Sequence, residues 1–365
     1  MSATNGSLFR KLVTCMVAVF ALSAILASAA SAKPIPIKET QLTLGDSLAF
    51  GYSQQLFNEN FPAESPSAFE AGYSEEYFDL QKPVNNGIQE TNDGCPGETT
   101  DSMIGNGPLG AALDPETGES PCGYHKLGFP LHNEYGGTKS QLENTVETIA
   151  VDSFVGKPVT SITLNIGAND ELHAISKCEA EVKSEYEKEG KSKYGATPEE
   201  AVKHCIEAHA SGLFEHILKN IGSILFALRN AGTYFGGVNY TGTIAFVGGY
   251  DPYGAVFVTH QELLVGSNAL ASLLNFHENK LITDEGTEAA EEGHEAFHGC
   301  FQNPQPLWNP GNKQEPVRLK KWTNMANMKE DRGLKYGEKE ADGPDIHPTP
   351  EGYIVLGKDL YLACP

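Results

Sequence analysis

Short runs of alternating or β-branched apolar residues recur along this chain, as expected of buried strands. The clearest run covers residues 159–166, and similar runs occur at 42–44 and 243–247. A weaker run lies within 84–93. The pattern therefore predicts three clear strands and a weak fourth.

Between these runs the apolar residues recur every three or four positions, which indicates helices. The helical stretches cover 140–154, 213–228, 263–282 and 353–362. Strands that alternate with helices predict a mainly parallel sheet with helices on both faces. No repeat and no linker interrupts this order, so we expect one domain over residues 33–365.

Other segments have no long regular period. A short helical stretch is expected at 50–61, and 62–83 has the composition of a loop. We expect insertions near 105–137, 175–210 and 283–343; the last is acidic and irregular, and its pattern does not locate a strand. The charged insertion at 175–210 is either a lid over the functional site or a solvated helical hairpin.

The first 32 residues have the composition of a secretory signal peptide. Arg10 and Lys11 precede an apolar run at 12–29, and an Ala-Ser-Ala sequence ends at Ala32. This order predicts cleavage after Ala32 and a secreted protein. A membrane anchor is the alternative, because the apolar run is nearly long enough to span a bilayer. No later segment is apolar enough to span.

Cysteine content and charge fit an exported protein. An even number of cysteines outside the leader favours disulfides over metal ligands. We expect pairing between neighbours, so that each bond closes one loop or ties down the C-terminus: 95–122, 178–205 and 300–364, formed by Cys95, Cys122, Cys178, Cys205, Cys300 and Cys364. The formal charge of −22 argues against nucleic acid or an anionic membrane as a partner.

Candidate chemistry gathers where the predicted strands end. Ser47 follows the first strand, and Gly97 and Asn169 follow two others. The carboxyl ends of parallel strands share one sheet edge, so these residues can converge there. His347, with Asp345 two residues before it, precedes the last helix. Acyl transfer needs a nucleophile, a base with an orienting group, and oxyanion donors. Ser47 can supply the nucleophile and His347 the base. The oxyanion donors would be the backbone N–H groups of Ser47 and Gly97 and the side-chain amide of Asn169.

Four sequence blocks in this order resemble those of the GDSL, or SGNH, hydrolases. The blocks are Leu44-Gly45-Asp46-Ser47-Leu48, Gly97 within Cys-Pro-Gly-Glu-Thr-Thr, Gly167-Ala168-Asn169-Asp170, and the segment from Asp345 to Tyr353. The resemblance implies a flavodoxin-like three-layer α/β/α sandwich and no metal or other cofactor. It also implies ester hydrolysis through Ser47, Gly97, Asn169 and His347.

The last block departs from the family's commonest form, which has aspartate three residues before the histidine. Pro344 occupies that position here, with Asp345 two residues and Asp342 five residues before His347. We favour Asp345 as the carboxylate that orients His347. Asp342 and a backbone carbonyl remain the alternatives.

A second motif suggests a different chemistry. His294-Glu295-Ala296-Phe297-His298 has the zinc-binding His-Glu-x-x-His spacing, which requires a helix. Gly293 and Gly299 flank it, and no third histidine follows at the metzincin spacing. We therefore interpret the motif as a coincidence.

Together these patterns predict a secreted, monomeric serine esterase or lipase. Its substrate is a small-molecule, lipid or carbohydrate ester, and its acyl-enzyme forms on Ser47. The alternatives are a zinc hydrolase that uses His294 and His298, and a non-catalytic binding module with the same fold.

Overall fold

The computed structural model describes most of the chain beyond the expected leader. Side chains within the helix at 261–291 are described at 268–285. The leader, most of the 105–137 insertion, Cys122, His294 and Asp342 lie outside the described residues. The described ranges are 39–60, 65–85, 87–105, 130–135, 139–255, 261–291, 296–311, 314–326 and 345–365.

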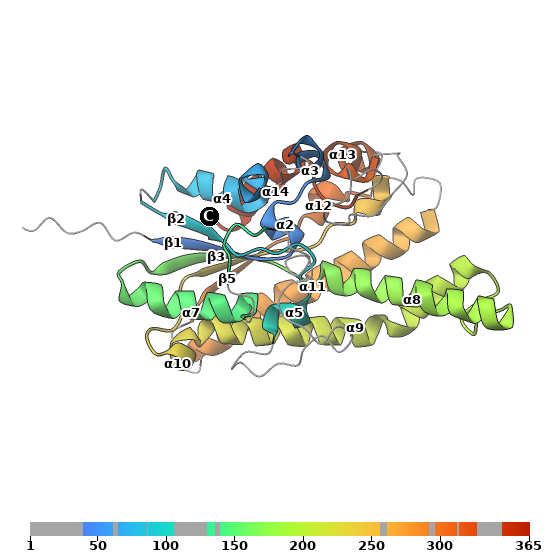
Figure 1. The fold of residues 1–365 in the computed structure, drawn as a ribbon, viewed down its shortest axis with the longest axis horizontal. Helices are drawn as coiled ribbons and strands as arrows, with labels where there is room; N and C mark the ends of the chain where they lie inside the picture. The colour runs from blue at the N-terminus through green and yellow to red at the C-terminus, as the bar shows by residue number, and fades with distance from the viewer. Residues whose placement is uncertain are drawn as a thin grey trace, which may run out of the picture. The chain divides into compact units, whose positions relative to one another are not determined.

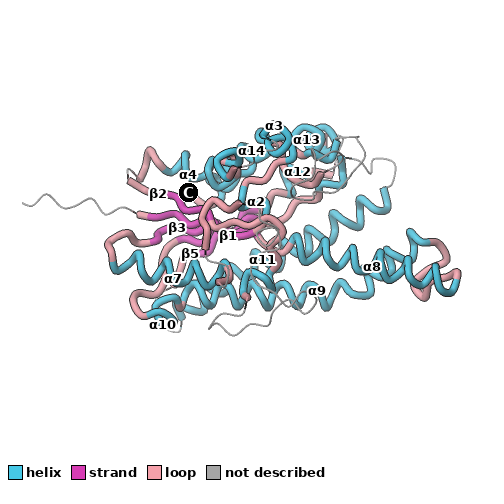
Figure 2. The backbone as a smooth tube through the Cα atoms, viewed as in Figure 1, coloured by secondary structure: helices cyan, strands magenta, loops and turns pink. Residues whose placement is uncertain are grey.

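A five-stranded parallel sheet runs through the described part of the chain (Figures 1 and 2). Its order, β2-β1-β3-β4-β5, is the order of flavodoxin-like folds. Every pair of neighbouring strands is parallel, which confirms the predicted parallel sheet. The strands are β1 (Thr40–Gly45), β2 (Gln89–Asn92), β3 (Val159–Asn165), β4 (Thr243–Val247) and β5 (His298–Gln302).

Helices cover both faces of the sheet, so the fold is the expected three-layer α/β/α sandwich (Figure 1). One face carries α5 (Thr100–Ile104), α7 (Gln141–Phe154), α9 (Pro198–Arg229), α10 (Ala231–Phe235) and α11 (Gln261–Glu291). The other carries α3 (Gln54–Asn60), α4 (Tyr73–Gln81), α12 (Gln305–Trp308), α13 (Glu315–Trp322) and α14 (Pro350–Ala363). Short helical turns lie at η1 (Pro66–Phe69), η2 (Pro252–Ala255) and η4 (Asn324–Ala326).

Two hydrophobic clusters hold these layers together. In the first, Leu44 and Leu164 of the sheet belong to the same buried cluster as Ile217 and Ile221 of α9. In the second, the aromatic and aliphatic side chains of α12, α13 and α14 pack together, with Trp308 fully buried. Each fully buried aliphatic side chain contributes about 1.5–3 kcal/mol, so these clusters supply the main driving force for folding.

The structure differs from the expected secondary structure in three segments. The 283–343 segment, where the sequence located no strand, contains β5. Only one of its five residues is buried, so it lacks the apolar alternation that marks a strand. The 62–83 segment contains α4, whose polar sequence becomes helical where it packs on α14. The helix expected at 50–61 is divided, because Gly51 has φ +82° and separates the short α2 (Ser47–Phe50) from α3.

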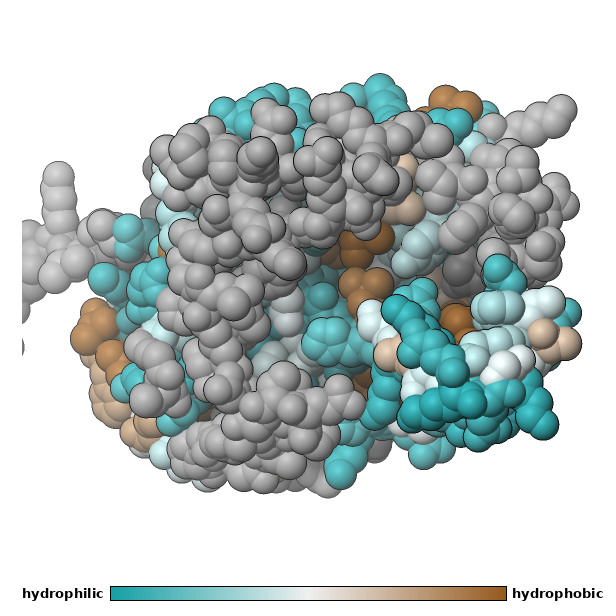
Figure 3. Space-filling view, turned by 45° about the vertical axis from the view of Figure 1, so that its right-hand side comes forward, coloured by the Kyte–Doolittle hydropathy of each residue, from teal (hydrophilic) through white to brown (hydrophobic). Residues whose placement is uncertain are grey.

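The charged insertion is a helical hairpin made by the ends of α8 (Ala168–Glu189) and α9. Thr197 caps α9, and Pro198 takes its first position, so the helix begins well before the predicted 213. Cys178 and Cys205 form a disulfide inside a small apolar cluster of the hairpin. The surface over the hairpin is hydrophilic (Figure 3).

Two of the three predicted disulfides are confirmed. Cys178 bonds to Cys205, and Cys300 bonds to Cys364, which ties β5 to the end of α14. Cys95 is also disulfide-bonded, and its expected partner lies outside the described residues. Among the described helices, none is both long and apolar enough to cross a membrane.

Candidate active site

Ser47 occupies the first turn after β1, at the carboxyl edge of the sheet. Gly45 ends the strand with φ +129°, and a Cβ there would lie 1.8 Å from the carbonyl oxygen of Asn165. Gln141 of α7 accepts from the Gly45 N–H (2.7 Å) and donates to its carbonyl oxygen (2.9 Å). Asp46 then caps α2, because its carboxylate accepts the Leu48 N–H at 2.9 Å. The turn therefore holds Ser47 at a helix start.

His347 lies between Ser47 and Asp345. Its Nε2 is 2.7 Å from Ser47 Oγ, and its Nδ1 is 2.6 Å from Asp345 Oδ1. The three side chains therefore form one continuous hydrogen-bonded chain, in the order that serine hydrolysis requires. Tyr52 packs edge-on against the His347 ring, with 4.6 Å between ring centroids.

The segment that carries His347 is fixed from two sides. Tyr250, after β4, donates its hydroxyl to the Ile346 carbonyl oxygen at 2.6 Å. Asn324, after α13, donates its backbone N–H to the His347 carbonyl oxygen at 3.0 Å. The orientation of the imidazole thus depends on the layer formed by α13 and α14 as well as on the sheet.

The electrostatics of the site favour a charged imidazole. Burial by itself lowers the pKa of His347, but the negative charge and hydrogen bond of Asp345, together with the charge of Asp46, raise the pKa above its ordinary value. Burial raises the pKa of Asp46 to about 7, in spite of the Leu48 N–H that favours its ionised form. An imidazolium that forms between these acids is therefore stabilised.

Of the three candidate oxyanion donors, two lie in the described cavity wall and one does not. Ser47 and Asn169 line the same cavity. The Asn169 side-chain amide also donates to the Glu98 carbonyl oxygen at 2.9 Å, which ties it to the turn that contains Gly97. Gly97 adopts φ +82° and is not part of the described cavity wall. Its backbone N–H therefore has a weaker geometric case than the Asn169 amide.

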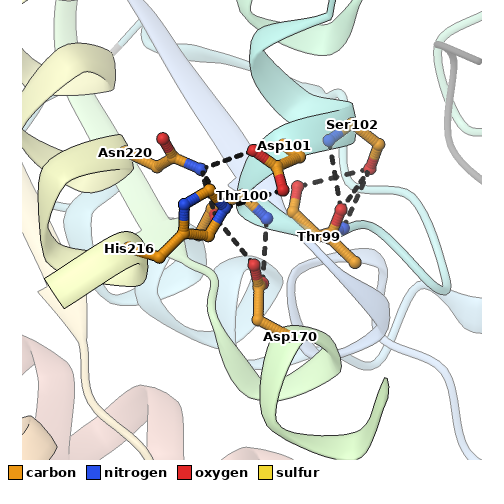
Figure 4. A network of polar contacts seen from close by, with 7 residues as sticks. All are labelled: Thr99, Thr100, Asp101, Ser102, Asp170, His216 and Asn220. Carbon is orange, nitrogen blue, oxygen red and sulfur yellow. Dashed lines mark hydrogen bonds and ion pairs between the residues drawn. The ribbon is translucent and has the colours of Figure 1, made fainter. Parts of the chain in front are cut away.

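A polar network joins the segment after Gly97 to the helices that follow β3 (Figure 4). Asp170 accepts the backbone N–H of Thr100 at 2.9 Å and its hydroxyl at 2.7 Å. Asn220 of α9 donates to the same hydroxyl and to Asp101. The network fixes α5 against α8 and α9, and so fixes the relative positions of the Gly97 turn and Asn169.

Two groups of described side chains could be considered as metal ligands. Asp101, Asp170 and His216 bring ligand atoms within 4.8 Å of one another, but these atoms are already engaged in the network of Figure 4. The other group consists of His209 and the two bonded cysteines of the hairpin, which have no free thiolate. In the zinc motif, His298 is the first residue of β5, so the pentapeptide does not form the single helix that the motif requires.

A cavity of about 120 Å³ opens beside Ser47 and His347. Aliphatic side chains from α8 and α11, together with Tyr250 and Tyr253, form much of its wall. Two acids, Glu171 of α8 and Glu278 of α11, also face it. From the charged insertion, Ile175 alone belongs to the described wall, so the tip of the hairpin is not part of it.

Sequence reasoning missed the residues that support the site rather than form its motifs. Gln141, Tyr250 and Asn324 lie outside all four blocks, and the cavity acids carry no recognisable spacing. A weak signal existed for Gln141, because it follows Ser140 at a predicted helix start. The other supporting residues became visible only in the fold.

Comparisons with known proteins give distant structural likenesses. No protein-family model and no curated protein matches the chain. A carbohydrate acetylesterase from Sinorhizobium meliloti is 14% identical, with a TM-score of 0.39 over 89% of this chain and 97% of that one. Phospholipase A1 from Streptomyces albidoflavus NA297 is 13% identical, with a TM-score of 0.40 over 89% and 98%. An extracellular lipase from Streptomyces rimosus is 12% identical, with a TM-score of 0.41 over 87% and 97%.

Proposed function

We propose that this protein is an exported serine esterase of the SGNH type, which hydrolyses carboxylic esters through an acyl-enzyme on Ser47. The observation that carries the proposal is the hydrogen-bonded chain Ser47–His347–Asp345, with contacts of 2.7 and 2.6 Å beside a cavity. The disulfides fit an oxidising compartment, and export through the expected leader would bring the protein to one.

The proposed reaction uses these three side chains in two halves. Ser47 Oγ attacks the ester carbonyl carbon while His347 Nε2 takes the hydroxyl proton. His347 Nδ1–H donates to Asp345, whose negative charge stabilises the imidazolium. The tetrahedral intermediate then expels the alcohol oxygen, which takes the proton from Nε2. Water attacks the acyl group in the second half, giving its proton to Nε2, and the carboxylic acid leaves as Ser47 recovers its proton.

The oxyanion that forms in each half needs hydrogen-bond donors. We assign this role to the Ser47 backbone N–H and the Asn169 side-chain amide, with the Gly97 N–H as a third donor. Donors of this kind act chiefly in the transition state, because the negative charge is greatest there.

The test combines covalent labelling with turnover of 4-nitrophenyl acetate. A fluorophosphonate should label Ser47, and a chelator should leave turnover unchanged. Ser47→Ala should lower kcat by about 10⁴- to 10⁶-fold, whereas Ser223→Ala, at an exposed serine of α9, should have no effect.

Other outcomes point to the alternatives. Loss of activity with the chelator, without labelling of Ser47, would support a zinc hydrolase. Stoichiometric labelling without turnover of any ester would support a non-catalytic module.

A further inference from the structure

Two acids face the cavity without a hydrogen-bond donor for all of their oxygens. Glu278 is only 2% exposed, and its Oε2 is buried without a partner among the described residues. Glu171 Oε1 is likewise buried and without a partner there. Both side chains belong to the cavity wall that also contains Ser47 and His347. Buried polar atoms are nearly always hydrogen-bonded to protein or to ordered water, so these two oxygens at one cavity are free to accept from donors of a bound ligand.

The acidic residues of the cavity indicate that the ligand's donor group is positively charged. Its described wall contains Asp46 and the two glutamates but no lysine or arginine. Burial raises the pKa of Glu171 to about 7, and the negative charges of Asp170 and Asp251 add to this effect. Burial also raises the pKa of Glu278 well above its ordinary value, with a further contribution from Glu171. A cation between the two acids would relieve both the burial and the repulsion, which a neutral hydroxyl cannot do.

The two acids lie near the start of α8, which carries the candidate oxyanion donor Asn169. Glu171 lies two residues after Asn169 on α8, and a Cβ added to Gly167 would lie 3.9 Å from Glu278 Oε1. The carboxyl groups therefore flank the start of the helix that carries the candidate oxyanion donor. The same cavity wall contains Ser47, so a small ester that reaches Ser47 can carry a group that binds these acids.

We propose that Glu171 and Glu278 form a specificity site for a primary ammonium group, so that the enzyme acts on esters that carry a protonated amine. This proposal rests on the proposed esterase function. A primary ammonium has three N–H donors, enough to satisfy both orphan oxygens at once. The cavity of about 120 Å³ is well below the roughly 300–1,000 Å³ of sites that bury drug-sized ligands, which favours a short substituent.

Binding without turnover provides the first test. Calorimetry should show that n-butylammonium binds the wild-type protein about 10- to 100-fold more tightly than butan-1-ol, because hydrogen bonds from a charged donor are the stronger ones. Tetramethylammonium, which has no N–H donor, should bind more weakly than n-butylammonium. Equal affinity for n-butylammonium and butan-1-ol would overturn the proposal.

Variants then locate the site. Glu278→Gln and Glu171→Gln should each lower n-butylammonium affinity by about 10-fold or more. Glu215→Gln removes an exposed acid from α9 and should leave that affinity unchanged. An equal loss in all three variants would indicate attraction to the acidic surface only, and would contradict the assignment.

Competition connects the site to catalysis. n-Butylammonium should inhibit hydrolysis of 4-nitrophenyl acetate competitively in the wild-type protein and much less in Glu278→Gln. Binding without competition would place the cation away from Ser47 and refute the specificity role. If the protein hydrolysed no ester, the proposed function would fail, whereas the calorimetric comparison would still decide whether the two glutamates bind an ammonium.

Discussion

At the scale of single residues, Asp345 accepts a hydrogen bond from His347 Nδ1 and raises the pKa of His347, so we propose that it orients the imidazole. We expect Asp345→Asn to lower kcat by about 10⁴-fold, because an amide favours the wrong imidazole tautomer. The wild-type rate should fall on the acid side with a midpoint above 6.5, since only neutral His347 accepts a proton and its pKa is raised. Removing the Asp345 charge should move that midpoint to lower pH. Pre-steady-state and steady-state rates across pH 4–9 provide the measurement.

Asp342→Asn is the matched control for this prediction. It removes the same charge from a residue five positions before His347, and we expect a rate near that of wild type. A severe loss in Asp342→Asn with little change in Asp345→Asn would move the orienting role to Asp342. Two variants with full activity would instead favour a backbone carbonyl.

Some residues of the site could be predicted from the sequence, and others could not. Ser47 and His347 belong to compact blocks, so their candidacy needed no fold. The orienting carboxylate stayed open because chain spacing does not determine which way a loop side chain points. Glu171 and Glu278 are 107 positions apart on two helices, and no local pattern relates them. Only packing of α8 and α11 around one cavity brings them together.

At the scale of elements, the end of β1 depends on a glycine that lies against β3. We expect Gly45→Ala to prevent folding or to reduce stability severely, because its Cβ would lie 1.8 Å from Asn165 O and its φ is +129°. Gly212→Ala is the control, since nothing lies within 4 Å of its Cβ inside the exposed part of α9. Alanine there should stabilise by about 0.5–1 kcal/mol. Soluble yield and urea unfolding would measure both changes, and a well-folded Gly45→Ala protein would contradict the first.

The apolar pattern of the sequence predicted the buried elements β3 and α7 but not the edge strand β5. The β3 strand is nearly all buried and rich in alternating and β-branched residues, and α7 has a Ser140 cap and a clear apolar face. By contrast, β5 lies at the sheet edge with mostly half-buried residues, and its place depends on pairing with β4 and on the Cys300–Cys364 bond. Edge elements that depend on long-range partners carry little local pattern, which is why β5 was not predicted.

At the scale of the whole molecule, acidic residues outnumber basic ones, and several acids are buried inside the fold. The chain carries a formal charge of −22. Burial raises the pKa of several acids inside the fold: that of Asp93 to about 6, that of Asp46 to about 7 and that of Glu90 to about 8. The folded state therefore binds protons more tightly at these positions than the unfolded state does. Such an interior is most stable when the acids are protonated.

We therefore expect the free energy of unfolding to decrease as pH rises from about 5 to about 8. Each of these carboxyl groups has a higher pKa in the folded state than its unfolded value of 3.8 or 4.5. The stability that protonation of the group gives the fold is therefore fully present below the unfolded pKa. It is lost as the pH rises through the folded pKa. The loss is about 1.4 kcal/mol per pH unit for each group within its window. His132 opposes the trend, because burial lowers its pKa, but it is one group against several.

Calorimetric melting at fixed ionic strength would measure this dependence. The melting temperature should be higher at pH 5.5 than at pH 8, by about 5 °C or more. Added salt should recover only part of the difference, because it screens repulsion between surface charges more than the burial of the interior acids. A melting temperature that stays constant or rises between pH 5.5 and 8 would show that these acids are already ionised at low cost in the fold. Recovery of the whole difference by salt would assign the trend to the surface charge alone.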